Sequence, residues 1–272
     1  MAKSDKLKGK KFKSDKGKDK GLKLTEIKSD SKFKGWTMGA LIEALKKVPF
    51  GSEAHSQIHK ALSKHVAKKY PEQYVLAVKN KFVLHEIEHS LAKYGDVTPF
   101  DQIDHNFGKR TFGEDDNFTF VSREEAEYNF EWKQVSVFGF VTDGTNYLLL
   151  RKNETNEITM IGGHVDYSLD IYRKPQLEIL REAMETELKE EVKHGKQLTV
   201  PEKPIALVNT FNKFNDIFHM AFIYKIEVDD LSQFAAKTGE PEKHSVITIS
   251  SKESLLTNPD IHHWFKTIEE YL

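Results

Sequence analysis

Two apolar runs with β-strand character lie near the middle of the chain. VSVFGFVT and NYLLLRK are rich in β-branched and aromatic residues, and the dipeptide Asp143-Gly144, which favours a tight hairpin turn, joins them. The predicted strands are 134–142, 146–152, 157–161, 204–212, 217–227 and 244–250. The predicted helices are 176–194 and 259–271, the second with Asn258 as N-cap and Pro259 at its first position. Strands that alternate with helices in this way predict an α/β domain over residues 121–272.

The chain before this domain has a helical pattern instead. Met38, Leu41, Ile42 and Leu45 share one helical face. Three helices are predicted: Met38 to near Pro49, Ser52 to about Tyr70, and Pro71 to about Tyr94. We therefore expect a small helical region over residues 36–96 and a linker, rich in glycine and acidic residues, over residues 97–120.

Charge separates the N-terminus from the rest of the chain. Residues 1–35 hold thirteen lysines and five acidic residues, a balance of +8, whereas the whole chain of 272 residues has a net charge of −1. Such a Lys-rich segment cannot bury enough apolar surface to offset its ordering entropy, so a disordered tail is predicted. The tail could bind nucleic acid or another polyanion, or could simply keep the protein soluble.

Composition excludes several classes of protein. The chain has no cysteine, which excludes disulfides and thiolate metal sites and fits a reducing compartment such as the cytoplasm, where we expect the protein. No apolar run approaches the roughly 18 residues that a membrane span needs. The N-terminus lacks the apolar core of a secretory signal and the arginines of a mitochondrial one.

Acidic residues cluster at the end of the predicted helix 176–194. Glu187, Glu190 and Glu191 have the i, i+3, i+4 spacing that places side chains on one helical face, where three carboxylates repel one another unless a cation lies among them. Oxygen-only ligands suit a hard divalent ion such as Mg²⁺ or Mn²⁺. Such an ion neutralises phosphate charge and lowers the pKa of an attacking water. The alternative is an ordinary solvated helix face.

The segment from Gly162 to Glu191 resembles the Nudix box, G-x5-E-x7-R-E-U-x-E-E-x-G-U, where U is aliphatic. Gly163 stands at the box glycine, Glu178 at the first glutamate, and Glu187, Leu188, Glu190 and Glu191 match E-U-x-E-E. The upstream segment 122–153 and the Gly-Gly-His loop resemble a Nudix subgroup with a lengthened connection to the helix. The resemblance covers about residues 120–272 and implies a Nudix-like α/β/α sandwich with a mixed sheet.

Three features depart from the box. Thr186 replaces the arginine that braces the loop in the family, Lys193 replaces the last glycine, and the gap from Gly163 to Glu178 is nine residues longer than the pattern. Arg181, one turn earlier, is a candidate to compensate for the missing arginine. Loss of this arginine leaves open a second interpretation, a Nudix-fold protein that binds nucleotides or RNA ends with weak or no cleavage.

The resemblance implies a hydrolase that splits the diphosphate of a nucleoside diphosphate linked to another moiety. It implies Mg²⁺ or Mn²⁺ held by Glu187, Glu190, Glu191 and the Gly163 carbonyl. It also implies supporting roles for Gly162, His164 and Glu178, and Glu178 would either support the metal site or orient the helix. Arg151, at the end of the second predicted strand, is a candidate to contact phosphate or is an ordinary surface residue.

The general base is a further expectation. It is either one of the box glutamates, Glu187 or Glu190, or an acid before the last strand, Glu240 or preferably Glu242. ADP-ribose, NAD, dinucleoside polyphosphates and RNA ends all remain candidate substrates. Phe138, Tyr147, Phe211 and Phe214 are candidates to stack on a base, or are core residues.

A competing motif lies in the helical region. His85, Glu86 and His89 satisfy H-E-x-x-H, in which two histidines bind Zn²⁺ and the glutamate acts as a base, as in metallopeptidases. Charged Glu88 inside the motif and twelve histidines in the chain favour a chance match. A third zinc ligand would come from Asp96, Asp101, Asp104 or His105.

Overall fold

The computed structural model describes residues 33–49, 52–69, 73–80, 96–103, 111–112, 118–167, 173–193, 195–232, 234 and 243–272. The predicted tail therefore lies almost entirely outside the described residues, as do half of the predicted linker and the whole H-E-x-x-H motif. Within the described part, no helix has the length and apolar character needed to cross a membrane.

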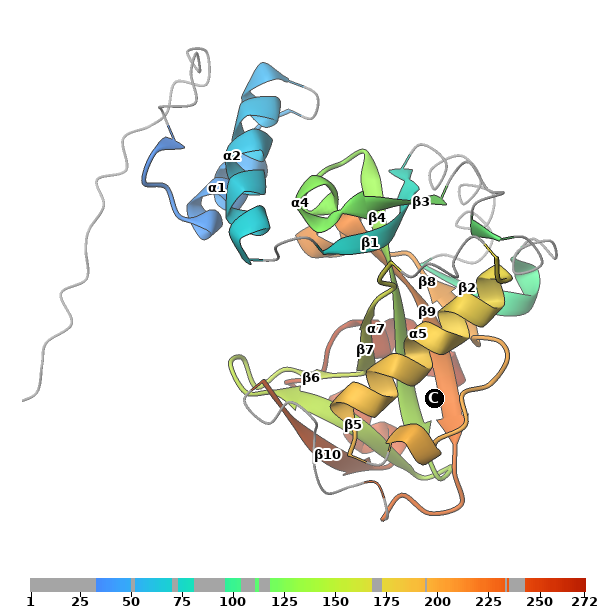
Figure 1. Ribbon diagram of the computed structural model, residues 1–272. Helices are drawn as coiled ribbons and strands as arrows, with labels where there is room; N and C mark the ends of the chain where they lie inside the picture. Colours follow the sequence, from blue (N-terminus) through green and yellow to red (C-terminus); the bar gives the residue numbers. More distant parts are fainter. Residues whose placement is uncertain are drawn as a thin grey trace, which may run out of the picture.

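A mixed sheet forms the centre of the protein, and its main path runs β10-β5-β4-β9-β8-β2 (Figure 1). The strands on this path are β10 (His244–Ser250), β5 (Asn146–Lys152), β4 (Trp132–Thr142), β9 (His219–Glu227), β8 (Ala206–Val208) and β2 (Val97–Pro99). Four further strands pair beside it: β1 (Tyr74–Lys79), β3 (Phe118–Ser122), β6 (Ile158–Thr159) and β7 (Ile161–His164). β4 and β9 are parallel over nine residue pairs, whereas the other pairings are antiparallel.

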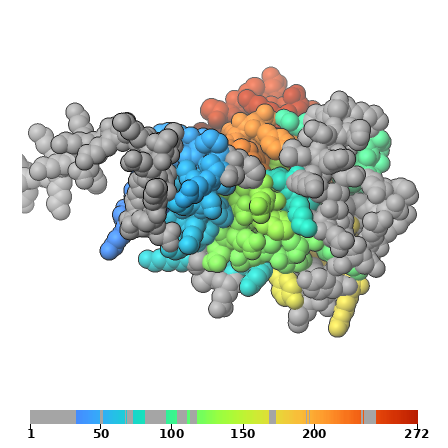
Figure 2. Space-filling view, turned by 90° about the horizontal axis from the view of Figure 1, so that it is seen from above, coloured from blue at the N-terminus to red at the C-terminus, as the bar shows by residue number. Residues whose placement is uncertain are grey.

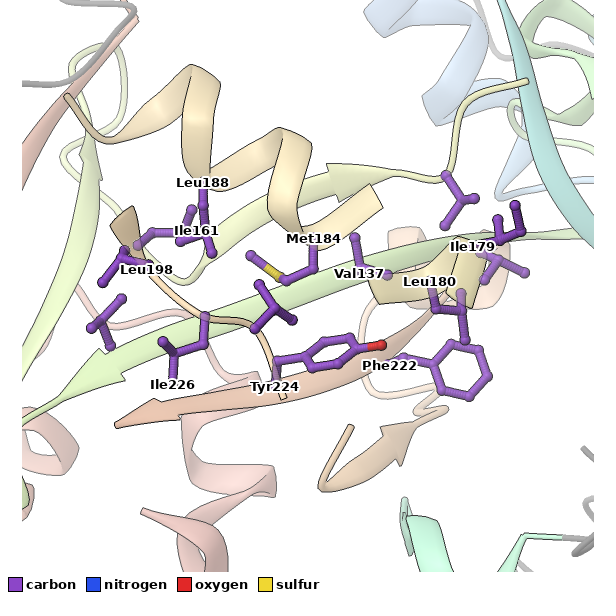
Figure 3. Close-up of a cluster of buried hydrophobic side chains, with 14 of the residues drawn as sticks. Val137, Ile161, Ile179, Leu180, Met184, Leu188, Leu198, Phe222, Tyr224 and Ile226 are labelled. Atoms are coloured by element: carbon purple, nitrogen blue, oxygen red, sulfur yellow. The ribbon is translucent and has the colours of Figure 1, made fainter. Parts of the chain in front are cut away.

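Alternation along the central strands creates two apolar layers, one on each face of the sheet. Val135, Val137 and Val141 of β4 belong to one buried cluster, and Phe140 of the same strand belongs to the other. The helix α5 (Gln176–Glu191) covers the first face, where Leu180, Met184 and Leu188 pack against Tyr224 and neighbouring residues of the sheet (Figure 3). Leu255 of α6 (Lys252–Thr257) and Trp264 and Phe265 of α7 (Trp264–Thr267) cover the second face. The α/β/α sandwich with a mixed sheet is therefore confirmed.

Two helices precede the sheet. α1 (Met38–Leu45) and α2 (Glu53–Lys69) bury Leu41, Leu45 and Leu62 against each other. The pair packs beside α4 (Arg123–Ala126), and Figure 2 shows it next to the green surface of that part of the chain. Phe130 and Phe214 also pack against this helical cluster, so it is joined to the sheet by aromatic contacts.

The third predicted helix is wrong in its described part. Residues 74–79 form strand β1, which pairs with β3 and β4. The run Val75–Val78 is buried throughout, so it shows no alternation and its strand character is hidden in the sequence. The sheet thus begins well before residue 121, and the predicted linker contains β2 and the first part of β3.

The C-terminal helix is also placed differently from the prediction. Asn258 is the C-cap of α6, whose N-cap is Ser251, so the predicted start at Asn258 and Pro259 is wrong. A residue before proline is disfavoured in the helical region, and Asn258 is extended. The next residues pair with the sheet: Ile158 N–H donates to Asp260 O, and His262 N–H donates to Ile158 O, each at 2.8 Å. α7 and the 3₁₀ helix η7 (Glu269–Tyr271) follow as short elements.

The remaining predicted elements differ mainly in their ends. The Asp143-Gly144 turn joins β4 and β5, and α5 covers most of the predicted helix 176–194. The Gly-Gly-His segment is strand β7 rather than a loop. Of the strand predicted at 204–212 only β8 forms, and the 3₁₀ helix η6 (Phe214–Phe218) precedes β9. Two further 3₁₀ helices are short: η2 (Phe100–Gln102) follows β2, and η5 (Gly195–Gln197) follows α5.

Candidate active site

Strand β7 meets the helix α5 at Gly163. A β-carbon added to Gly163 would lie 2.5 Å from Glu187 Oε1, so the Glu187 carboxylate lies directly against the backbone of this residue. At Gly162 a β-carbon would lie 2.1 Å from Val137 O, and its φ of +145° also favours glycine. Both glycines are therefore required by close packing, and the sequence prediction that Gly162, Gly163 and Glu187 belong to one site is consistent with this contact.

The other two acidic residues of the predicted metal site, Glu190 and Glu191, have different surroundings from Glu187. Glu191 is buried, and its Oε2 lies 3.1 Å from Nδ1 of His244 on β10. Glu190 is exposed. Among the described residues, no three histidine, aspartate or glutamate side chains are gathered as a ready group for a metal ion. The oxygen donors of Glu187 and Glu191, one turn apart, nonetheless fit a hard divalent cation by their chemistry. The assignment of Glu187, Glu190, Glu191 and the Gly163 carbonyl as metal ligands therefore stays a prediction.

Glu178 lies far along α5 from these carboxylates. Nine residues separate it from Glu187, about 13 Å of helix. Its Oε1 is 3.7 Å from Nζ of Lys174, which also pairs with Glu182 at 2.5 Å. Of the two supporting roles implied for Glu178, orienting the helix start therefore agrees with its contacts better than supporting the metal.

Thr186 does not replace the missing arginine. Its hydroxyl donates to the Glu182 carbonyl at 2.9 Å and the side chain is exposed, so it braces only its own helix. Arg181, the candidate to compensate, has Nε 3.8 Å from Glu185 Oε1. Burial raises the pKa of the Tyr224 phenol, and the positive charge of Arg181 opposes this shift.

A cavity of about 360 Å³ lies on the other side of Gly162 and Gly163. β4 and β5 pair at only two positions near their shared turn, after which β7 pairs with β4 and β6 pairs with β5. The two long strands therefore diverge, and the cavity opens between them. His164 lines it, as do the neighbours Leu150 and Lys152 of Arg151, but Arg151 does not. The expected phosphate contact by Arg151 therefore has no support in this cavity.

Histidines that the sequence did not single out form much of the cavity wall. His219, His244 and His262 line it together with Asp216 and Trp264. These residues come from β9, β10, η6 and the segment around α7, so no local pattern joins them. The adjacent pair His262 and His263 before Trp264 is the one local sequence signal for this wall. The predicted helix from residue 259, which is wrong, placed this pair inside a helix.

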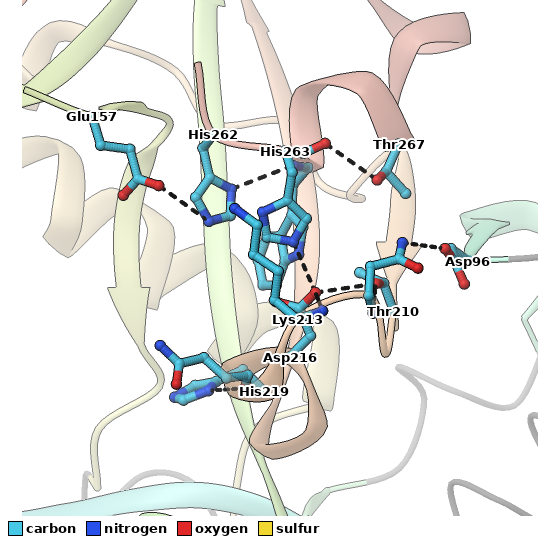
Figure 4. A network of polar contacts seen from close by, with 12 residues as sticks. Asp96, Glu157, Thr210, Lys213, Asp216, His219, His262, His263 and Thr267 are labelled. Atoms are coloured by element: carbon cyan, nitrogen blue, oxygen red, sulfur yellow. Dashed lines mark hydrogen bonds and ion pairs between the residues drawn. The ribbon is translucent and has the colours of Figure 1, made fainter. Parts of the chain in front are cut away.

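Polar contacts neutralise the charges along this wall (Figure 4). Asp216 Oδ2 accepts hydrogen bonds from Thr210 Oγ1 and the Lys213 backbone N–H, both at 3.1 Å, and lies 2.8 Å from His263 Nε2. Nζ of Lys152 donates to Glu157 Oε2 at 2.7 Å. Both charged residues that line the cavity, Lys152 and Asp216, thus have partners of their own.

Two histidines of the wall are held in the neutral form by burial. Burial lowers the pKa of His262 to about 4, with Glu157 opposing and His263 adding to the shift. Burial also holds the pKa of His164 well below its usual range, assisted by His219 and Arg123. A neutral imidazole both donates and accepts a hydrogen bond, so these rings suit polar, uncharged groups.

Lys133 is a second buried polar residue, next to this network. Its side chain is fully buried on β4, donates to Asn209 Oδ1 and to Thr210 O, and lies 3.9 Å from the ring centre of Phe211. Burial lowers its pKa to about 7, opposed by the charges of Asp216 and Asp96. The lysine holds the segment that leads into η6 and so supports Asp216 in the cavity wall.

The four aromatic residues proposed for base stacking have different environments. Phe138 lines the cavity, with its ring centre 5.6 Å from that of Trp264. Tyr147 is buried in the core, and Phe214 packs in the aromatic cluster against the helical pair. Phe211 is exposed and covers Lys133. Phe138 is therefore the candidate that agrees with a base-binding role.

Several predicted functional residues lie outside the described residues. Glu240 and Glu242, the candidate bases before β10, are among them, as are Asp104 and His105. The zinc motif His85, Glu86 and His89 also lies there. Of the candidate third zinc ligands that are described, Asp96 accepts a 2.8 Å hydrogen bond from Asn212 Nδ2, and Asp101 is exposed. These sites stay predictions from the sequence.

Comparison with known proteins finds similar folds among solved structures. No family model matches this chain, and no curated protein matches it. Among solved structures, Tm1382, a candidate Nudix hydrolase, is 22% identical with a TM-score of 0.47, covering 67% of this chain and 88% of that one. A Nudix hydrolase from Clostridium perfringens is 18% identical with a TM-score of 0.35, covering 51% and 95%. A MutT Nudix hydrolase from Burkholderia pseudomallei is 18% identical with a TM-score of 0.37, covering 51% and 96%. At these levels the likeness concerns chain arrangement, and the functional argument rests on this chain's own residues.

Proposed function

We propose that the protein is a divalent-metal-dependent hydrolase that cleaves the diphosphate linkage of a nucleoside diphosphate joined to another moiety. The observation that carries the proposal is the contact between Glu187 and Gly163, which brings the acidic end of α5 to the wall of the cavity. A cavity that has polar side chains in its wall and carboxylates beside it is a common form of a hydrolytic site.

The residues of the site would have separate roles in binding metal, positioning and proton transfer. Glu187, Glu190 and Glu191 would hold Mg²⁺ or Mn²⁺, which when bound supplies neutralisation of phosphate charge and a lower pKa for water. Gly162 and Gly163 leave the room that Val137 O and the Glu187 carboxylate occupy, so they would keep Glu187 at the cavity wall. In the reaction a water oxygen bonds to one phosphorus, the bridging P–O bond breaks, and the water proton passes to a carboxylate. Glu190 and Glu242 are the candidates for that base.

A hydrolysis screen tests the proposal. The full chain is incubated with Mg²⁺ or Mn²⁺ and with ADP-ribose, NAD, diadenosine polyphosphates, nucleoside triphosphates and 5′-capped RNA. Glu190→Gln and Glu242→Gln are assayed beside Glu185→Gln, the same substitution on another face of α5, where Glu185 pairs with Arg181 and Lys189. We expect turnover of one substrate class, lost in Glu190→Gln and kept in Glu185→Gln. Turnover that survives Glu190→Gln and Glu187→Gln would remove the acidic site from the mechanism.

A second candidate function is nucleotide or RNA-end binding with little or no cleavage. The observation that favours it is Thr186, which bonds to its own helix and leaves the loop without the brace found in the family. This alternative predicts measurable binding of a panel member to the wild-type protein without products. The capped RNA in the panel also tests whether the Lys-rich tail contributes to recognition of nucleic acid, since such binding weakens steeply with salt.

A further inference from the structure

The last acidic residue of α5 contacts a histidine from the edge of the sheet. Glu191 Oε2 lies 3.1 Å from Nδ1 of His244, the first residue of β10. The two residues are 53 positions apart in the chain. They meet because β10 is the end strand of the main sheet path and α5 ends near β5 and β10 (Figure 1). The contact is therefore made by the fold and has no local signal in the sequence.

Burial and charge make a hydrogen-bond donor important at this position. The exposed fractions of the Glu191 and His244 side chains are 9% and 19%, so water does little to solvate or screen the pair. Glu191 is the last residue of α5, where the carbonyl dipoles of a helix end disfavour negative charge. Glu187 and Glu190 stand within one turn and add repulsion. A buried carboxylate in these surroundings needs a donor or a cation directed at it.

The direction of the hydrogen bond follows from the two groups. An ionised carboxylate only accepts hydrogen bonds, so His244 carries a proton on Nδ1 and donates it to Glu191. The donor is well placed, because β10 pairs with β5 at seven successive positions, from His244 opposite Lys152 to Ser250 opposite Asn146. A carboxylate has lone pairs on both oxygens, so it can accept this bond and coordinate a cation at the same time.

Two carboxylates of α5 are thus held by groups from other strands. Glu187 lies against the backbone of Gly163, and Glu191 lies against His244. Gly163 and His244 both line the same cavity. His219 in the same wall is different, because its Nδ1 lies 2.9 Å from the backbone oxygen of Asn215 rather than from a carboxylate. Of these two histidines, His244 is the one that contacts an acidic residue of α5.

We propose that His244 is a positioning residue for the divalent metal: by donating from Nδ1 it holds the Glu191 carboxylate ready to coordinate the cation. The inference rests on the proposed function, in which Glu191 is one of the metal ligands. His244 acts through Glu191 and does not touch the cation. Residues that bond to metal ligands in this way typically contribute a factor of about 10–100 to metal affinity, because they fix the orientation of the ligand.

Mn²⁺ binding without substrate tests the inference. The metal-free full chain is titrated with Mn²⁺ at one fixed pH, and free Mn²⁺ is followed by electron paramagnetic resonance. His244→Leu removes the donor, and we expect the Kd for Mn²⁺ to rise about 10- to 100-fold. His244→Asn puts an amide N–H close to the position of Nδ1 and should recover most of the affinity. His219→Leu, which removes a histidine bonded to a backbone oxygen, is the matched control and should keep the affinity.

A double-variant cycle shows whether His244 acts through Glu191. Glu191→Gln removes the charge that His244 holds, so adding His244→Leu to Glu191→Gln should weaken Mn²⁺ binding by no more than about a further twofold. A full further loss in the double variant would mean that His244 acts on the metal by another route, and it overturns the inference.

A merely structural contact predicts a different result. It would lower the urea midpoint of metal-free His244→Leu and leave the Mn²⁺ affinity of the folded variant unchanged, which overturns the inference. His244→Phe keeps a flat ring without the donor, and it repeats the titration if His244→Leu does not fold. Failure of His244→Asn to bind Mn²⁺ more tightly than His244→Leu also contradicts a role for the Nδ1 donor.

The titration and the hydrolysis screen fail independently. Mn²⁺ affinity that depends on Glu191 and His244 supports the inference even where no substrate of the panel is cleaved, and then only the hydrolase proposal fails. Turnover that is lost in Glu190→Gln, together with Mn²⁺ affinity unchanged in His244→Leu, overturns the inference and leaves the hydrolase proposal intact. No Mn²⁺ binding by the wild-type chain, or binding unaffected by both Glu187→Gln and Glu191→Gln, overturns the inference and the proposed metal ligands together.

Discussion

The carboxylate of Glu187 on α5 lies against the α-carbon of Gly163 on β7, close enough that a β-carbon there would come within 2.5 Å of Oε1. This contact fixes the helix that carries the acidic residues relative to the strand that forms the cavity wall. A change at either residue should therefore alter the position of both α5 and β7 in the candidate site.

Gly163→Ala should damage the site without requiring any change of backbone conformation. The new methyl group would force the Glu187 carboxylate or the helix to move, which we expect to lower the free energy of unfolding by about 1–3 kcal/mol. We also expect hydrolytic turnover to fall at least about tenfold, since a displacement of about 1 Å in a catalytic group has large effects. Thermal unfolding and the hydrolysis assay measure the two effects.

The control for this variant is Gly39→Ala. A β-carbon at Gly39, inside α1, meets no atom within 4 Å, and alanine favours a helix by about 1 kcal/mol over glycine, so stability should rise slightly. A double variant, Gly163→Ala with Glu187→Ala, should recover part of the lost stability because the clash is removed. No recovery would mean that the methyl group disturbs something other than Glu187.

Glu190 and Glu191 should respond differently to the same substitution. Glu190 is exposed, so Glu190→Gln should change the free energy of unfolding by less than about 0.5 kcal/mol while removing turnover. Glu191 is buried and contacts His244, so Glu191→Gln should cost about 1–3 kcal/mol of stability as well as activity. Urea denaturation gives the first quantity for each variant. Equal stability losses at the two positions would contradict the burial difference.

Lys133 makes stability depend on pH in the alkaline range. Its pKa is about 7 in the folded protein and 10.5 ordinarily, so between these values the unfolded chain binds a proton that the folded protein does not. The free energy of unfolding should therefore rise as pH rises from about 7 to 10.5 and be level in this respect below 7. Lys133→Met should flatten the rise, whereas Lys79→Met, at an exposed lysine of β1, should leave it unchanged. A rise that persists in Lys133→Met would assign it to another group.

How much the sequence predicted depends on whether an element's signal is local. The helix α5 has a local signal, because Glu187, Glu190 and Glu191 have helical spacing and match a known motif. The buried run of strand β1 shows no alternation and so fits a helix as well as a strand, and only its pairing with β3 and β4 identifies it. The cavity escaped prediction for the same reason. His219, His244 and His262 are separated by at least eighteen residues and meet only through the divergence of β4 and β5.

His262 makes stability depend on pH in the acidic range. Its pKa is about 4 in the folded protein, mainly because of burial, and 6.5 ordinarily. Between these values the unfolded chain takes up a proton that the folded protein does not, so the free energy of unfolding should fall as pH falls from about 6.5 to 4, by on the order of 2 kcal/mol for this group. His262→Gln should reduce the slope without removing it, because His164 has a pKa lowered in the same direction. His65→Gln on α2 serves as the control. Urea denaturation at several pH values measures the slope, and an unchanged slope in His262→Gln would show that the pKa of this ring is not lowered in the folded protein.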